Sequence, residues 1–265
     1  GGVWSAGSFG WRIDHARTRS RCCHQDAPRP GMTSPHPSVK ICSLRHVVHA
    51  DWVVAAGADQ FGLIFAPHAR RLVAVDDARL IVARARSIAG PVPPKAVGVF
   101  LDQSASEINQ IAESVDLDAI QILTHARPVA WEEIERPAIP VFRPAPDADL
   151  DQLLREIAST FGRNARVSSI LLDAFAPTIG GAGVLGNWTI AAQVAKRYPV
   201  ILAGGLNPTN VTEAIAAVHP SGVDVSSGVE TDNLKDRTKI DTFVKNARQA
   251  LAECDETASS VRPAV

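Results

Sequence analysis

The sequence has almost no net charge and no long apolar run. Its 265 residues carry 27 lysines and arginines against 28 aspartates and glutamates, a formal net charge of −1. Without a basic excess, we expect no binding to nucleic acid or to anionic lipid. No stretch of 18 apolar residues occurs, and the N-terminus lacks the charged-then-apolar order of a signal peptide. We therefore expect a cytoplasmic protein without a membrane segment.

Cysteine and methionine are scarce. None of the four cysteines, Cys22, Cys23, Cys42 and Cys254, forms a C-x-x-C pair, which argues against a zinc site, a redox motif or a disulfide framework. The P-loop spacing of nucleotide-binding enzymes is also missing. We expect neither a bound metal nor a nucleotide cofactor, and we look for function in a pocket that holds a small molecule.

The two ends of the chain lack the pattern of a packed core. Residues 1–37 have no apolar period and contain several prolines and glycines, so we expect a disordered N-terminal extension. The single methionine, Met32, is the expected natural start; a transit-like leader is the alternative. Residues 255–265 are polar and are expected to form a flexible tail, which leaves 38–254 as one domain.

Between these ends, short apolar runs alternate with segments of helical period, the pattern of a parallel sheet with crossover helices. The expected strands are 39–44, 60–65, 96–100, 119–123, 140–143, 169–173, 200–203 and 222–225. The expected helices include 75–87, 104–115, 149–160, 189–196, 209–218 and 239–251, with a weak fourth helix near 131–135. Eight such rounds predict a (β/α)₈ TIM barrel, an α/β fold whose active site lies at the C-terminal ends of the strands.

Small residues follow the last two expected strands. Gly204 and Gly205 come after one of them, and Ser226, Ser227 and Gly228 come after the other. Glycines let backbone N–H groups approach an anion, and the loops after strands seven and eight of this fold often bind phosphate. We expect a phosphorylated ligand there, the alternative being tight turns without a ligand.

Several motifs carry a family resemblance. The first expected strand contains K-I-C-S-L at 40–44, and F-A-P at 65–67 precedes Arg71. Further along the chain stand L-D-A-I-Q at 117–121, L-L-D-A at 171–174 and G-G-A-G at 180–183. In this order and spacing, from about Lys40 to Leu251, the motifs resemble those of the phosphoribosylanthranilate isomerase family of tryptophan biosynthesis. The related histidine-pathway isomerases have aspartate at the position of Cys42.

The resemblance implies an Amadori rearrangement of N-(5-phosphoribosyl)anthranilate to the carboxyphenylamino-deoxyribulose phosphate, without a cofactor. It implies Cys42 as the general base, which requires a nearby cation or dipole, and Asp173 as the general acid, which burial or a like charge would keep protonated. It also implies that Arg71 binds the anthranilate carboxylate and that Gln121 and Asp224 lie against the ligand.

Five positions depart from the family pattern: Ser43, Leu72, Leu123, Ala182 and Val184. They leave two alternatives open, a divergent isomerase acting on another aminosugar phosphate and a non-catalytic barrel that binds a phosphosugar. Taken without the family pattern, Cys42 is a small buried hydrophobe, Asp173 a strand-end cap and Arg71 a surface residue. A monomer and a homodimer are both compatible with the sequence.

Overall fold

The computed structural model describes residues 37–123, 129–145, 147–173 and 188–260, with the backbone alone for 255–260. Ala182, Val184 and the expected start at Met32 lie outside the described residues, as does all of the expected N-terminal extension except residue 37. None of the helices in the described part has the length and apolarity needed to cross a bilayer.

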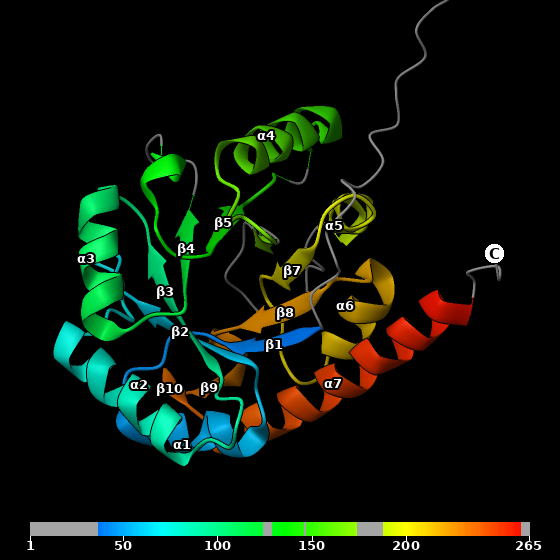
Figure 1. Ribbon diagram of the computed structural model, residues 1–265. Coiled ribbons are helices and arrows are strands. Elements are labelled where there is room, and N and C mark those ends of the chain that lie inside the picture. Colours follow the sequence, from blue (N-terminus) through cyan, green and yellow to red (C-terminus); the bar gives the residue numbers. More distant parts are fainter. Residues whose placement is uncertain (1–36, 124–128, 146, 174–187, 261–265) are drawn as a thin grey trace, which may run out of the picture.

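Eight parallel strands close into a barrel in chain order, with β1 hydrogen-bonded to β8 (Figure 1). The strands are β1 (Ser38–Ile41), β2 (Gln60–Ile64), β3 (Lys95–Phe100), β4 (Ala119–Leu123), β5 (Ala138–Phe142), β6 (Ile170–Asp173), β7 (Val200–Ala203) and β8 (Gly222–Val225). Each lies where the sequence predicts a strand, with shifts of up to three residues at the ends. The predicted (β/α)₈ fold is confirmed.

Helices cover the outside of the barrel (Figure 1). They are α1 (Val47–Ala56), α2 (Val75–Ile88), α3 (Ala105–Val115), α4 (Leu150–Arg163), α5 (Trp188–Ala195), α6 (Val211–Val218) and α7 (Arg237–Ser260). After β4 the described residues form one 3-10 turn, η1 (Trp131–Glu133), so the helix predicted near 131–135 is only a turn. A second turn, η2 (Ser227–Val229), and a hairpin of β9 (Glu230–Thr231) and β10 (Leu234–Lys235) follow β8.

The last helix is longer than predicted. It continues to Ser260, whereas the sequence predicts its end at Leu251 and a flexible tail from Asp255. The segment between these points contains no glycine or proline, and the first helix breaker is Pro263. Polar composition alone therefore placed the end of this helix too early.

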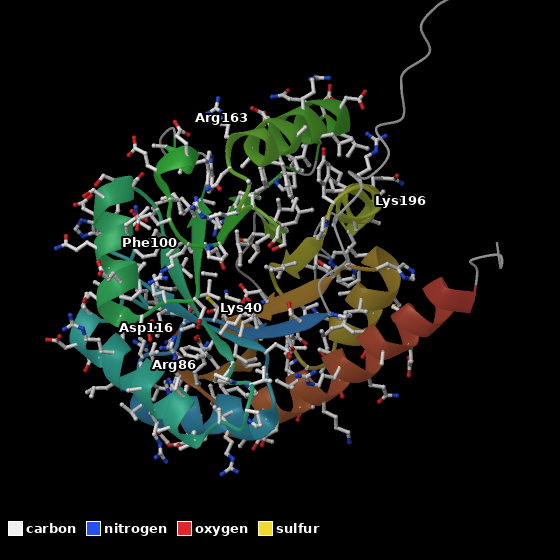
Figure 2. All side chains as sticks on the ribbon, viewed as in Figure 1. Lys40, Arg86, Phe100, Asp116, Arg163 and Lys196 are labelled. Carbon is white, nitrogen blue, oxygen red and sulfur yellow. The ribbon has the colours of Figure 1, made fainter. Side chains whose placement is uncertain are left out.

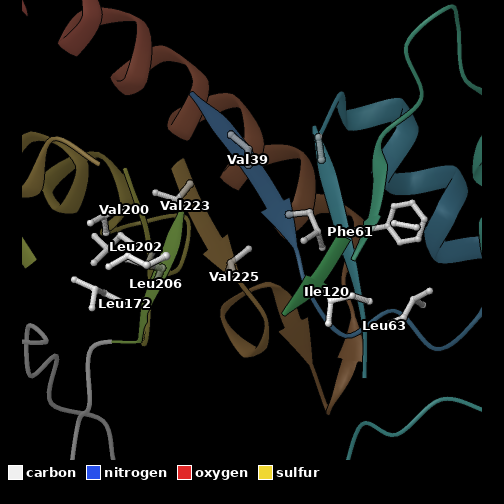
Figure 3. Close-up of a cluster of buried hydrophobic side chains, with 14 of the residues drawn as sticks. Val39, Phe61, Leu63, Ile120, Leu172, Val200, Leu202, Leu206, Val223 and Val225 are labelled. Atoms are coloured by element: carbon white, nitrogen blue, oxygen red, sulfur yellow. The ribbon is translucent and has the colours of Figure 1, made fainter. Parts of the chain in front are cut away.

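Successive side chains of each strand point to opposite faces of the barrel wall, which separates two hydrophobic clusters. Val39 and Ile41 of β1, and Val223 and Val225 of β8, belong to the larger cluster, which packs beneath the helices (Figure 3). A smaller cluster fills the interior of the barrel and contains Val97, Ala119, Ile139, Val141, Leu171, Ile201 and Ala203. The remaining residues of β1 and β8, including Lys40 and Asp224, therefore point into the barrel.

Candidate active site

Polar side chains replace apolar ones toward the C-terminal mouth of the barrel. Cys42 and Asp224 alternate with residues of the outer cluster, and so do Gln121 of β4 and Asp173 of β6. All four therefore point to the inside, at or near the ends of their strands. These predicted site residues come from four separate strands, and the structure places them on the inside of the same mouth.

Lys40 of β1 lies inside the barrel (Figure 2), in contact with two members of this group. Its side chain is 1% exposed, and Nζ donates to Oε1 of Gln121 over 2.9 Å and to Oδ1 of Asp224 over 3.0 Å. Burial alone would lower the pKa of Lys40, but the charges of Asp224 and Cys42 hold this pKa above its ordinary value. The ammonium is thus a fixed positive charge inside the barrel.

Lys40 is the first residue of the K-I-C-S-L motif, but the sequence pattern indicates no role for it. The available signal was its position two residues before Cys42 on a strand with period 2, which places both side chains on the inner face.

Asp224 is the acidic partner of this lysine. Burial raises the pKa of Asp224, the Lys40 ammonium acts against this rise, and the negative charge of Asp173 adds to it. The two carboxyl groups are therefore close enough to influence each other. The predicted position of Asp224 at the ligand end of β8 is consistent with this geometry, and its ion pair with Lys40 was not foreseen.

Cys42 is buried at the end of β1, where its backbone N–H donates to the carbonyl of Val225 over 2.8 Å. The neighbouring position on β2 is Gly62. A Cβ atom there would lie 2.5 Å from Sγ of Cys42 and 3.2 Å from Nζ of Lys40. The missing side chain of Gly62 therefore provides the space that the thiol and the ammonium occupy together.

A second buried cation faces the thiol. Lys235 of β10 interacts electrostatically with Cys42, and its Nζ donates to the carbonyl of Ser226 and to Oε1 of Glu230, each over 2.9 Å. Burial lowers the pKa of Lys235, although Glu230 opposes this effect. The cation that sequence reasoning required near Cys42 is present twice.

Arg71 forms a bidentate ion pair with Glu230. Its Nε and Nη2 donate to the two carboxylate oxygens over 2.8 and 2.7 Å, and its side chain is 18% exposed. Burial would raise the pKa of Glu230, but hydrogen bonds from Arg71 and Lys235 lower it to about 2. Arg71 is therefore held in place and is not a free surface residue; sequence reasoning did not foresee Glu230 as its partner.

Asp173 pairs with a residue that the sequence did not single out. Oδ2 of Asp173 accepts a hydrogen bond from Nε of Arg143, which follows β5, over 2.7 Å. The Asp173 side chain is 25% exposed. Of the two influences expected at Asp173, a like charge is present in Asp224 and burial is partial, and Arg143 adds an opposite charge that was not expected.

The two predicted phosphate-binding loops are in contact. Gly204 and Gly205 have φ of 91° and 68°, values that favour glycine. A Cβ atom on Gly228 would lie 1.9 Å from the carbonyl oxygen of Leu206, so the loop after β8 packs directly on the loop after β7. Among the hydrogen bonds between described residues, none uses the backbone N–H of Gly205, Ser227 or Gly228. These groups remain available for an anion.

The departures from the family pattern have visible consequences. Ser43 adopts a φ of 70°, a conformation that suits the glycine expected there, and its hydroxyl lies 2.7 Å from that of Ser226. Leu123 packs against the interior cluster, whereas Leu72 is exposed. The substitution at Ser43 therefore links the end of β1 to the loop after β8.

Metal-binding clusters are missing from the part of the chain that the structure describes, where no group of three or more histidine, cysteine, aspartate or glutamate side chains could hold an ion. Cys42 and Cys254, the two cysteines among these residues, are both free thiols. The chemistry available at the mouth is therefore that of a thiol, carboxyl groups, ammonium groups and guanidinium groups.

Comparison with known proteins gives a consistent result. The sequence model of the family described as N-(5'-phosphoribosyl)anthranilate (PRA) isomerase matches residues 39–246. The N-(5'-phosphoribosyl)anthranilate isomerase of Roseiflexus sp. (strain RS-1) is 42% identical over 216 residues, which is 80% of this chain and 98% of that protein.

Solved structures agree with the sequence matches. The crystal structure of phosphoribosyl anthranilate isomerase from Thermotoga maritima superimposes with a TM-score of 0.67 and 32% identity, over 80% of this chain and 99% of that one. A structure of the isomerase in complex with reduced 1-(o-carboxyphenylamino)-1-deoxyribulose 5-phosphate superimposes with a TM-score of 0.66 and 31% identity, over the same shares of the two chains. This chain belongs to the N-(5'-phosphoribosyl)anthranilate isomerase family.

Proposed function

We propose that this barrel catalyses the Amadori rearrangement of N-(5-phosphoribosyl)anthranilate in tryptophan biosynthesis, with Cys42 as general base and Asp173 as general acid. The observation that carries the assignment of the base is the position of Cys42, a buried thiol that shares the space beside Gly62 with the ammonium of Lys40 and also interacts with Lys235. Nearby cations favour the thiolate, which is the form able to accept a proton.

The reaction needs one proton at the ring oxygen and the removal of another from C2. Asp173 donates to the ring oxygen as the C1–O bond breaks, which gives the open-chain iminium ion. The Cys42 thiolate then takes the C2 proton, and the electrons of the C2–H bond move to the C1–C2 bond and neutralise the nitrogen. The resulting enolamine becomes the ketone when its C2 hydroxyl loses a proton and C1 gains one.

The charges around Asp173 support its role as the general acid only if the effect of the neighbouring Arg143 is offset. Its ion pair with Arg143 stabilises the carboxylate, so the acid form requires that Arg143 moves away or that a second negative charge counteracts it. The nearby Asp224 supplies such a charge, and the phosphorylated substrate brings more. We propose that substrate binding draws Arg143 from Asp173 and thereby leaves the acid protonated.

Binding of the substrate follows from the remaining residues. The unused N–H groups of Gly205, Ser227 and Gly228, together with Gly204 and the hydroxyl of Ser226, would hold the phosphate. Arg71 uses Nε and Nη2 on Glu230, which leaves Nη1 to donate to the anthranilate carboxylate. Gln121 accepts from Lys40 through its oxygen, so its amide NH₂ remains for the sugar.

Turnover of substrate made in place from anthranilate and phosphoribosyl pyrophosphate tests this function, by the fall in anthranilate-type fluorescence. We expect Cys42→Ala and Asp173→Ala each to reduce kcat about a hundredfold or more, the scale of a lost general acid or base. Cys254→Ala is the matched thiol control, since Cys254 lies on α7, outside the barrel.

Full activity in the Cys42→Ala variant would contradict the assignment of the base. A wild-type protein that binds a reduced product analogue but shows no turnover would instead favour a divergent isomerase or a non-catalytic phosphosugar-binding barrel.

A further inference from the structure

We propose that Lys40 is a positioning residue that keeps Cys42 in its thiolate form, through a buried ammonium fixed by Gln121 and Asp224. This inference rests on the proposed function of Cys42 as the base. It assigns a task to a residue that lies one strand repeat deeper in the barrel than Cys42.

Lys40 is a buried charge beside apolar side chains, so its presence needs an explanation. The hydrophobic cluster inside the barrel consists of valine, alanine, isoleucine and leucine side chains. A lysine at a position with 1% exposure is unfavourable unless its charge and its donors are compensated. A methionine or leucine would fill the same space at no electrostatic cost, so packing alone does not account for Lys40.

The hydrogen bonds of the ammonium point to the thiol. An ammonium has three N–H donors. Gln121 and Asp224 accept two of them at 2.9 and 3.0 Å. The remaining direction is toward the sulfur of Cys42, with which Lys40 also interacts and with which it shares the space left by Gly62.

Because an electrostatic interaction is reciprocal, the ammonium stabilises the thiolate as much as the thiolate stabilises the ammonium.

The other charges near Cys42 lie on other elements than β1. Lys235 also faces the thiol, but it donates to Glu230, which in turn binds Arg71. Asp173 is engaged by Arg143 on the opposite side of the mouth. Asp224 carries the opposite charge, and its Oδ1 accepts from the Lys40 ammonium over 3.0 Å, which fixes this ammonium inside the barrel. The Lys40 ammonium is therefore the cation that lies on the same strand as the thiol and shares its pocket.

Alkylation of Cys42 tests the proposal independently of turnover. The experiment uses the full chain with Cys22, Cys23 and Cys254 changed to serine, so that iodoacetamide reports on Cys42 alone. We expect Lys40→Met to slow alkylation at pH 7 by about tenfold or more, and to move the pH profile of alkylation upward by at least about one pH unit. Lys95→Met is the matched control, since Lys95 is exposed at the opposite end of the barrel.

Because Lys40→Met leaves the Asp224 carboxyl without its partner, this variant could fail to fold. A second pair of variants keeps the test decisive: Lys40→Met combined with Asp224→Asn is compared with Asp224→Asn alone, each after circular dichroism has shown a folded barrel. The double variant is expected to alkylate more slowly than the single variant.

Equal alkylation profiles in each pair of folded proteins would overturn the proposal and leave Lys40 with a structural role only. The turnover assay separates this failure from that of the proposed function. Slow alkylation of Lys40→Met together with full activity of Cys42→Ala would retain the role of Lys40 and reject Cys42 as the base. If both proposals hold, the acid limb of the kcat profile moves to higher pH in Lys40→Met while KM changes little.

Discussion

At the scale of single residues, the site depends on side chains that would be unfavourable elsewhere in the barrel. Lys40 and Asp224 are buried charges that compensate each other, and Cys42 occupies space that exists because Gly62 has no side chain. Their positions at the ends of expected strands, together with the family resemblance, predicted that Cys42, Asp173 and Asp224 would lie at the mouth. These patterns did not predict their partners, because ion pairs such as Lys40–Asp224 join residues far apart in the chain.

Gly62→Ala tests the shared space. The added methyl group would lie 2.5 Å from Sγ of Cys42 and 3.1 Å from its Cα, so the thiol must shift. We expect the unfolding free energy to fall by about 1–3 kcal/mol, as for other overpacked cores, and kcat to fall at least about tenfold. Urea unfolding and the fluorescence assay measure these effects.

Gly90→Ala is the control for this substitution, since no atom lies within 4 Å of the added methyl group there. Wild-type activity and stability in Gly62→Ala would show that the position of the thiol is not set by this contact.

Ser43 offers a second test, of backbone strain. Ser43→Gly and Ser43→Ala both remove the hydroxyl that contacts Ser226, and they differ only in a Cβ atom at a φ of 70°. We expect the alanine variant to be less stable than the glycine variant by about 1 kcal/mol, because L-residues are strained in this region. Thermal unfolding of the two variants side by side measures the difference; a more stable alanine variant would be incompatible with the observed φ.

At the scale of elements, short structures after the strands complete the site. The β9–β10 hairpin carries Glu230 and Lys235 to Arg71, which follows β2. The capping box of Ser104 and Glu107 at the start of α3 joins two residues three positions apart, a spacing that is visible in a sequence. The hairpin was not predicted, because its strands have two residues each and depend on contacts with distant parts of the chain.

The ion pair of Glu230 predicts an acid-dependent stability. Its pKa is lowered from 4.5 to about 2 in the folded protein, so its contribution is present above pH 4.5 and is lost as the pH falls toward 2. We expect Glu230→Gln to be less stable than wild type at pH 7 and to lose less additional stability between pH 4.5 and 2. Urea unfolding at several pH values within this window measures the difference.

Glu213→Gln serves as the control, since Glu213 is an exposed glutamate in the first turn of α6. If Glu230→Gln and wild type lose stability in parallel as the pH falls, Glu230 is not the group that makes the fold sensitive to acid.

At the scale of the whole molecule, closure of the barrel between β1 and β8 places Cys42 beside the loop that follows β8. The order of apolar runs was sufficient to predict the fold, and the matches to isomerases of the same family confirm it. Sequence patterns were less informative for the fourth helix and the end of α7, where tertiary contacts and the lack of a helix breaker decide the outcome.

Transfer of the C2 proton is the step on which the whole account depends. The most direct measurement uses substrate deuterated at C2 of the ribose and follows release of deuterium to water alongside product formation. The account predicts one deuterium released per turnover by the wild type, with a slowed rate, and loss of both release and turnover in Cys42→Ala while Cys254→Ala behaves as wild type. Release of deuterium by Cys42→Ala at the wild-type rate would contradict it.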